Sequence, residues 1–222
     1  MFLIVYVYVI AFVLNVINLY KSYKGSNYYS LFFIFKNLVF IFLFNYLFNY
    51  LVKIFNITFV DIKKMVVIFI ISILLYLKKR KYICLSFSSG LFYIICLLLN
   101  ISINFKEVVF LVGVLHIFEA MFLILNFILN MKLSNDLNEK LYLPLILGSI
   151  PIIFMIFYGR KNKENEYKKI VSGVVIFLYG IIILLVSILN NDVLSLVLMI
   201  SLHELILFVE NFIIKKIELI SN

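Results

Sequence analysis

The sequence predicts an all-α protein, a polytopic transmembrane helix bundle with about eight spans in a single multi-pass membrane domain. Three observations predict this fold. Hydrophobic residues make up 65% of the 222 residues and charged residues only 14%, which leaves too little polar surface to solvate a globule. The mean hydropathy is correspondingly high, at +1.16. The apolar residues also form continuous runs rather than the period-two alternation of transmembrane strands.

A helix needs roughly 20 mostly apolar residues to cross about 30 Å of hydrocarbon, and the runs between charged or Asn-rich breaks give the expected spans. In order, these spans are 2–20, 30–52, 65–77, 82–99, 107–130, 142–158, 170–189 and 194–214. Together they fill one domain, 1–222, in which we distinguish the halves 1–104 and 105–222.

The first run resembles a signal peptide in position, and the third run is short for a membrane span. The run at 2–20 has neither a basic n-region nor a small-residue cleavage site, and Lys21 and Lys24 follow it, so we read it as a retained anchor. The run at 65–77 is the shortest, and it crosses only if it extends backwards past Asp61 or if the bilayer thins around it. If this run is re-entrant, the bundle has about seven spans.

Two later runs carry cysteines and prolines. Cys84 and Cys96 lie twelve residues apart in the fourth run, about 18 Å along a helix axis, so they do not pair with each other. We expect both to be small apolar packing residues, and no CxxC pattern predicts a metal site or a cofactor. Pro144 and Pro151 fall in the sixth run, where we expect a kinked helix.

The net positive charge of the chain has an ordinary explanation in its loops. Lys and Arg outnumber Asp and Glu by 20 to 11, and short loops rich in cations stay cytoplasmic. The cations of the clearest such loop, 159–169, are Arg160, Lys161, Lys163, Lys168 and Lys169. We expect this loop and the C-terminus, two spans later, to be cytoplasmic, while the orientation of the N-terminal half is left open. The cations form no basic face or nucleic-acid motif, so we expect no nucleic acid as a partner.

The fifth span carries one of the only two histidines, in the stretch LVGVLHIFEAMFLILNF. His116 and Glu119 are three residues apart, hence about 60° apart around a helix, and Asn126 lies seven residues after Glu119 on the same face. These residues form a polar stripe at bilayer depth. An ionisable group there costs about 2.5 to 3.5 kcal/mol and is usually paired inside the bundle.

The eighth span carries the second histidine, in the stretch LVLMISLHELILFVENF. His203 and Glu210 are seven residues apart and share a face, with Asn211 nearby, whereas Glu204 points about 100° away from His203. We expect the two stripes to face each other and to fix the register of the two helices through hydrogen bonds. A path for protons or ions is the alternative, because histidine titrates near neutral pH.

The pair His203-Glu204 also begins the zinc-protease signature His-Glu-x-x-His. That signature needs a second histidine four residues after the first, and Leu207 stands at that position. We therefore expect neither enzymatic activity nor a bound metal. An intramembrane protease is the least favoured interpretation.

Four stretches in the second half carry a family resemblance. They are LVGVLHIFEAMFLIL at 111–125, the proline-bearing span that ends in Tyr158-Gly159, LYGIIILLVSIL at 178–189, and LHELILF at 202–208. Through them the segment from about 107 to 216 resembles the membrane region of Gram-positive bacterial PDZ-domain membrane proteins, the MinJ-like group. In that family a cytoplasmic PDZ domain usually follows the membrane region, and division-site members act as scaffolds.

The resemblance implies a non-enzymatic scaffold or assembly partner in the cell membrane. Its partners would be the lipid bilayer and other membrane or division-associated proteins. The positions that match the family pattern are His116, Glu119, His203 and Glu204, and the family gives them no catalytic role. No PDZ domain follows up to Asn222, so we expect either a shortened relative or a PDZ domain supplied by another chain. The alternative function is a proton- or ion-coupled transporter, or a transporter subunit, that uses the His and Glu residues of the fifth and eighth spans.

Overall fold

The computed structural model describes residues 9–14, 16–17, 27–58, 62–78, 84–128, 140–147, 150–157, 166–189 and 191–221. Contacts divide the chain into two compact units. The hairpin unit comprises Met1–Thr58 and Ile128–Asn165, and the helical unit comprises Phe59–Phe127 and Glu166–Asn222. Each unit therefore combines two segments that are distant in the sequence. The expectation of one domain with halves 1–104 and 105–222 stays a prediction.

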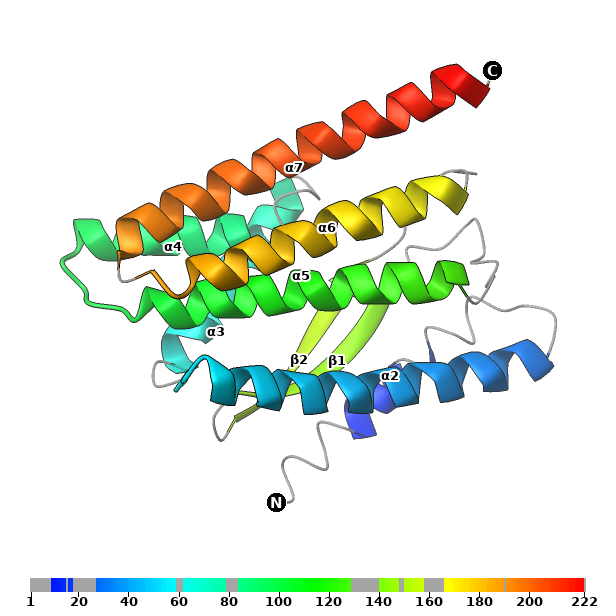
Figure 1. Ribbon diagram of the computed structural model, residues 1–222. Coiled ribbons are helices and arrows are strands. Elements are labelled where there is room, and N and C mark those ends of the chain that lie inside the picture. Colours follow the sequence, from blue (N-terminus) through cyan, green and yellow to red (C-terminus); the bar gives the residue numbers. More distant parts are fainter. Residues whose placement is uncertain are drawn as a thin grey trace. The chain divides into compact units, whose positions relative to one another are not determined.

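The hairpin unit contains a long helix and a two-stranded antiparallel sheet (Figure 1). Helix α2 (Asn27–Ile54) covers the second expected span and contacts strand β1 (Lys140–Leu147). Strand β1 pairs with β2 (Ile150–Phe157). The described residues of the first expected span, 9–14 and 16–17, are helical.

The prediction of a kinked helix at 142–158, the sixth expected span, is wrong, because this segment forms the β1–β2 hairpin. The register pairs Pro144 with Ile153 and Pro151 with Ile146. Residue pairs along an antiparallel ladder alternate between hydrogen-bonded and non-hydrogen-bonded pairs. These two pairs are two steps apart, so both are of the same kind, and proline fits the kind in which its backbone has no N–H to donate. In a helix, each proline would remove a backbone hydrogen bond and clash with the preceding turn. Two prolines among β-branched isoleucines therefore favour strands here.

The helical unit contains five helices in the described ranges (Figure 1). They are α3 (Ile62–Lys78), α4 (Leu85–Leu98), α5 (Phe105–Ile128), α6 (Glu166–Val186) and α7 (Asp192–Ser221). The described chain is thus predominantly α-helical, as the sequence predicts. Helix α3 has 17 residues, so its length of about 26 Å remains below the thickness of a typical hydrocarbon layer. Lys168 and Lys169, which we expected in a loop, lie in the first turn of α6.

Helices α2 and α4 end in the same way, at an asparagine with positive φ. Asn56 follows α2 with φ 49°, and Asn100 follows α4 with φ 54°. In both cases the N–H of the next residue bonds the carbonyl five residues before it, which is the Schellman closure. Helix α7 begins differently, because the side chain of Asn191 accepts a hydrogen bond from the N–H of Leu194 at 3.0 Å and so caps the helix.

Helices α5 and α6 approach closely because glycines lie at their contact. A Cβ atom on Gly180 would lie 2.6 Å from the Ile117 side chain and 2.9 Å from the carbonyl oxygen of Gly113. A Cβ atom on Gly113 would lie 2.9 Å from the backbone nitrogen of Leu184. Small residues permit such backbone approaches and are typical of helix pairs in membranes. The contact fixes the part of α5 that carries His116 against α6.

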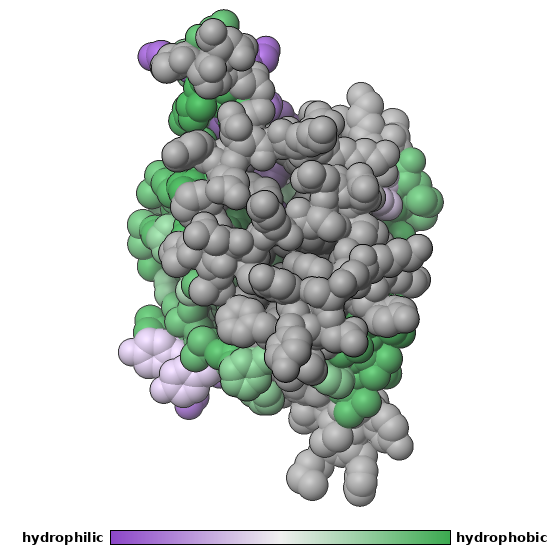
Figure 2. Space-filling view, turned by 90° about the vertical axis from the view of Figure 1, so that its right-hand side faces the viewer, coloured by the Kyte–Doolittle hydropathy of each residue, from purple (hydrophilic) through white to green (hydrophobic). Residues whose placement is uncertain are grey.

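The described outward face of α6 is apolar, and that of α7 is mostly apolar, with Ser201, Glu204 and Asn211 also exposed. Large side chains that are between 45% and 69% exposed are Val174, Leu178 and Leu185 on α6 and Val197, Phe208 and Phe212 on α7. Hydrophobic residues also cover most of the described part of the face in Figure 2. Within the described ranges, two helical stretches, Phe105–Leu125 and Asp192–Ile217, are long and apolar enough to cross a membrane. Shorter apolar helices are Val39–Ile54, Leu85–Leu98 and Ile170–Val186.

Candidate functional site

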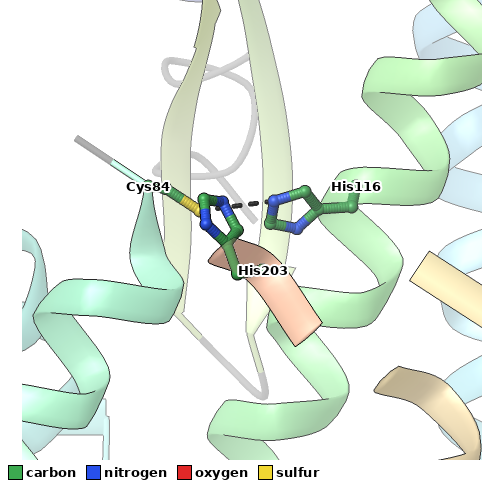
Figure 3. A group of neighbouring side chains, drawn as sticks. All are labelled: Cys84, His116 and His203. Atoms are coloured by element: carbon green, nitrogen blue, oxygen red, sulfur yellow. Dashed lines mark hydrogen bonds between the residues drawn. The ribbon is translucent and has the colours of Figure 1, made fainter. Parts of the chain in front are cut away.

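Three side chains that can bind a metal ion meet in the helical unit (Figure 3). They are Cys84, which immediately precedes α4, His116 of α5 and His203 of α7. One ligand atom of each lies within 4.8 Å of the others. His116 and His203 are 9% and 7% exposed, and Cys84 is half-buried. We call these three residues the Cys-His cluster.

The ring of His116 is held by the backbone of its own helix. Its Nδ1 lies 2.7 Å from the carbonyl oxygen of Val112, one turn earlier. A carbonyl only accepts, so in the neutral ring Nδ1 carries the proton and Nε2 presents a lone pair. Nε2 lies 3.3 Å from Sγ of Cys84 (Figure 3). The hydrogen bond to Val112 therefore aims a basic nitrogen at the thiol.

His203 lacks such a tie. In the part of the chain that the structure describes, its Nδ1 is buried and has no hydrogen-bond partner. The ring packs edge-on against two aromatic rings, with centroid distances of 4.9 Å to Phe87 and 5.5 Å to Tyr179. The ring of His116 lies 5.8 Å away. A buried polar group without a partner costs about 1 to 3 kcal/mol, so a partner is expected for this nitrogen.

A line of hydroxyl groups connects the cluster to the backbone of α7. Sγ of Cys84 lies 3.3 Å from Oγ of Ser86, and that oxygen lies 3.0 Å from the Tyr179 hydroxyl. Tyr179 donates its proton to the carbonyl of Met199 at 3.0 Å. Because the proton of Tyr179 is used there, the Ser86 hydroxyl donates to the Tyr179 oxygen, and the Ser86 oxygen accepts from the Cys84 thiol. The line thus ties the thiol of Cys84 to the backbone of α7 through two hydroxyl groups.

A second polar contact lies seven residues further along α7. Glu210 is 3% exposed and accepts a hydrogen bond from the hydroxyl of Ser172 in α6 at 2.5 Å. Glu210 shares a helix face with His203 but lies about 10 Å further along the axis. The contact joins α6 to α7 by an interhelical hydrogen bond and is separate from the Cys-His cluster.

The other residues of the expected polar stripes lie in different environments. Glu119 is half-buried in α5, whereas Glu204 and Asn211 are exposed on α7. Asn126 belongs to α5, with its side chain outside the described part of the chain. From the expected basic loop, Arg160, Lys161 and Lys163 also fall outside the described residues. The two stripes meet at their histidines.

Sequence reasoning missed the residues that complete the surroundings of the histidines, Cys84, Ser86 and Tyr179. We expected Cys84 to be a packing residue, and instead its sulfur lies within hydrogen-bond distance of His116. No spacing in the sequence connects position 84 with the two histidines. The available signal was the presence of only two histidines, both inside apolar helices, which left any third ligand to be found on another element.

No family model, curated protein or solved structure matches this chain. Its function is therefore inferred from the chemistry of the site and the polarity of the helix surfaces.

Proposed function

We propose that the protein is a multi-pass integral protein of the cell membrane that acts as a non-enzymatic scaffold or assembly partner. The distribution of polarity on α7 carries this proposal. His203 and Glu210 are buried, while Phe208 and Phe212 on the same helix are 69% and 59% exposed. An extended outward apolar face is typical of a surface that contacts lipid or another protein. In a bilayer, polar side chains gather inside the bundle, as these do.

The topology in this proposal follows from the pairing of α6 with α7. The two helices contact each other and are joined by a short turn, so two crossings return the chain to the side from which α6 starts. We place that side in the cytoplasm, because Lys168 and Lys169 lie in the first turn of α6 and cations favour the inner side. Each cation near an anionic leaflet adds about 1 kcal/mol of attraction.

The partners in this proposal are lipids and other membrane proteins, including division-associated ones. Support for division-associated partners comes from the resemblance of 107–216 to the membrane region of PDZ-type division-site proteins. The exposed side of α7 offers a surface on which a neighbouring helix would pack, since association in bilayers depends on van der Waals contact and occasional hydrogen bonds. Exposed Ser201 and Glu204 lie among its apolar residues and would supply such bonds.

Photocrosslinking in native membranes tests the scaffold. A benzophenone amino acid at Phe208, which is exposed, is compared with the same substitution at Phe118, which is fully buried in α5. We expect Phe208 to give a discrete protein adduct that resists alkaline carbonate extraction, and Phe118 to give none. Adducts to lipid alone at Phe208, or release of the protein by carbonate, would contradict the proposal.

A proton- or ion-coupled transporter is the second candidate, and two observations favour it. Glu210 is a buried carboxylate with a hydroxyl partner on another helix. A polar recess of about 500 Å³ lies where α4, α5 and α7 meet their connecting turns, and its lining includes Asn104, Lys106 and Asp192. Such a recess would be an entry for a hydrated ion, and Glu210 would be a proton carrier within the helices.

Flux through reconstituted vesicles separates the two candidates. A scaffold gives no proton or solute flux above that of empty vesicles. A transporter gives a flux that disappears in Glu210→Gln and in Glu119→Gln, while the protein inserts normally. Glu204→Gln is the matched control, since Glu204 is exposed on the same helix. A flux blocked in the first two variants and retained in the control would replace the scaffold by the transporter.

A further inference from the structure

We propose that Cys84, His116 and His203 bind a zinc ion that joins the start of α4 to α5 and α7. The inference goes beyond the scaffold proposed above and does not rest on it, because it concerns only the Cys-His cluster. The three ligands come from three elements and are 32 and 87 residues apart in sequence, by subtraction of their numbers. A metal ion bound to all three would therefore cross-link distant parts of the helical unit.

The spacing of the ligand atoms fits a tetrahedral ion. With Zn–S near 2.3 Å and Zn–N near 2.1 Å, tetrahedral zinc separates a sulfur from a nitrogen by about 3.6 Å. Sγ of Cys84 and Nε2 of His116 are 3.3 Å apart. The three ligand atoms lie within 4.8 Å of one another, so the widest pair has to close by about 1 Å, which is within reach of small side-chain rotations.

The hydrogen bonds around the cluster are those that a metal ligand requires. A ligating histidine usually donates its other ring N–H to a carbonyl or carboxylate, which fixes the tautomer. His116 does this through Nδ1 and Val112, so Nε2 is ready to bind. Cys84, whose thiol donates to Ser86 at 3.3 Å, would bind as a thiolate and release its proton to solvent.

The partnerless nitrogen of His203 is the second, independent observation. This side chain is 93% buried, given its exposure of 7%, and its Nδ1 has no hydrogen-bond partner among the described residues. A metal ion would give the ring the bond that the protein does not supply. The rings of Phe87 and Tyr179 pack edge-on against it and form an apolar wall on its side of the cluster.

The donor set selects the class of metal. One thiolate and two imidazoles are borderline-soft ligands, which suit Zn²⁺ and do not suit Mg²⁺ or Ca²⁺, since those ions prefer oxygen. Three protein ligands also leave a fourth position of the zinc tetrahedron for water or another donor. The broken His-Glu-x-x-His signature does not exclude a zinc site here. Leu207 stands where the signature needs its second histidine, and ligands on other elements take the place of that histidine.

Zinc content of the purified full chain is the first test. The protein is isolated in detergent through a tag without histidine, stripped with a chelator, reloaded with Zn²⁺ and desalted, and zinc is measured by plasma mass spectrometry. We expect about one ion per wild-type chain and at least a tenfold loss in Cys84→Ser and in His203→Ala. Cys96→Ser is the matched control, because Cys96 is a buried cysteine inside α4, the helix that Cys84 precedes, and it should keep the zinc.

A second measurement decides the matter even if the ligand variants fail to fold. In the Cys96→Ser protein, Cys84 is the sole thiol, and its alkylation rate is measured with and without Zn²⁺. We expect zinc to slow alkylation at least tenfold, and Co²⁺ to give thiolate-to-cobalt absorption in the near ultraviolet. Equal zinc in wild type and Cys84→Ser, or an alkylation rate that Zn²⁺ leaves unchanged, would overturn the proposal.

Discussion

Helix α7 carries two buried ionisable side chains on one face, His203 and Glu210, and their polar atoms are satisfied to different degrees. Glu210 accepts a hydrogen bond from the hydroxyl of Ser172 in α6, so the neighbouring helix supplies a partner for its carboxylate. His203, seven residues earlier, packs against aromatic rings and keeps a nitrogen without a partner in the described structure. The Glu210 contact is explained by helix packing alone.

The difference between these two sites shows how a structural polar contact is distinguished from a ligand site. Hydrogen bonding between helices satisfies both partners and needs nothing more. At His203 the described residues supply a thiol and a second imidazole, oriented by Val112, nearby, but no hydrogen bond to Nδ1. This unsatisfied atom, together with the two ligand atoms beside it, is the observation on which the proposed zinc site rests.

The largest effect is expected from Gly180→Ala. This substitution should damage the histidine site more than the Glu210 site and so separate the two. The new Cβ would meet the backbone of Gly113 and Ile117, which has no flexible end to move aside. We expect a loss of about 3 kcal/mol in stability and a lower zinc content, because α5 would be pushed from α6 beside His116. Thermal unfolding in detergent, followed by size-exclusion chromatography, measures the loss.

Gly90→Ala is the matched control for that substitution. Its Cβ would lie 2.6 Å from the Cδ1 atom of Ile200, the far end of a flexible side chain. We expect a change below about 1 kcal/mol. Equal losses in the two variants would mean that the close α5–α6 approach has no special role.

A smaller effect is expected from Ser172→Ala, which tests the Glu210 side of the comparison. The substitution removes the hydroxyl that donates to a buried carboxylate, so we expect a loss of about 2 kcal/mol with no change in zinc content. Ser201→Ala should change stability by less than about 0.5 kcal/mol, because Ser201 is exposed and bonds only the backbone of its own helix. Loss of zinc in Ser172→Ala would show that the two sites are coupled.

The smallest effect is expected from Tyr179→Phe, which sharpens the description of the histidine site. The phenol oxygen contacts Ser86 and Met199, whereas the ring packs on His116 at 4.7 Å. Removing the hydroxyl should cost about 1 kcal/mol and leave zinc binding within about tenfold, because the packing and the three ligands remain. Complete loss of zinc would assign Tyr179 a direct part in binding.

The helices were predictable because their signal is local. A continuous apolar run between charged breaks is sufficient to predict a helix, and α5, α6 and α7 appear where such runs lie. The hairpin at 140–157 was missed because hydropathy counts apolar residues without regard to backbone chemistry, while Pro144, Pro151 and the surrounding isoleucines favour strands. The prolines alone did not decide the matter, because a membrane helix tolerates proline as a kink and a strand tolerates it where no N–H has to be donated.

The candidate site was only half predictable. Helical periodicity separates His203 from Glu204, and the structure has the first buried and the second exposed. The partners of His203 could not be inferred, since Cys84 and Tyr179 reach it through the packing of α4 and α6, which no spacing in the sequence encodes. That Nδ1 of His203 lacks a hydrogen-bond partner among the described residues can be seen only once the positions of the neighbouring donors and acceptors are known.

Helix α7 has 30 residues and so measures about 45 Å, half as long again as the hydrocarbon layer it would cross. A helix of this length would fit a bilayer only with a strong tilt or with its last turns, including the exposed Lys215 and Lys216, in the headgroup region. The buried His203 and Glu210 sit on the same unbroken rod. A displacement of its C-terminal end would therefore move both polar sites together, because a single continuous helix connects that end to His203 and Glu210.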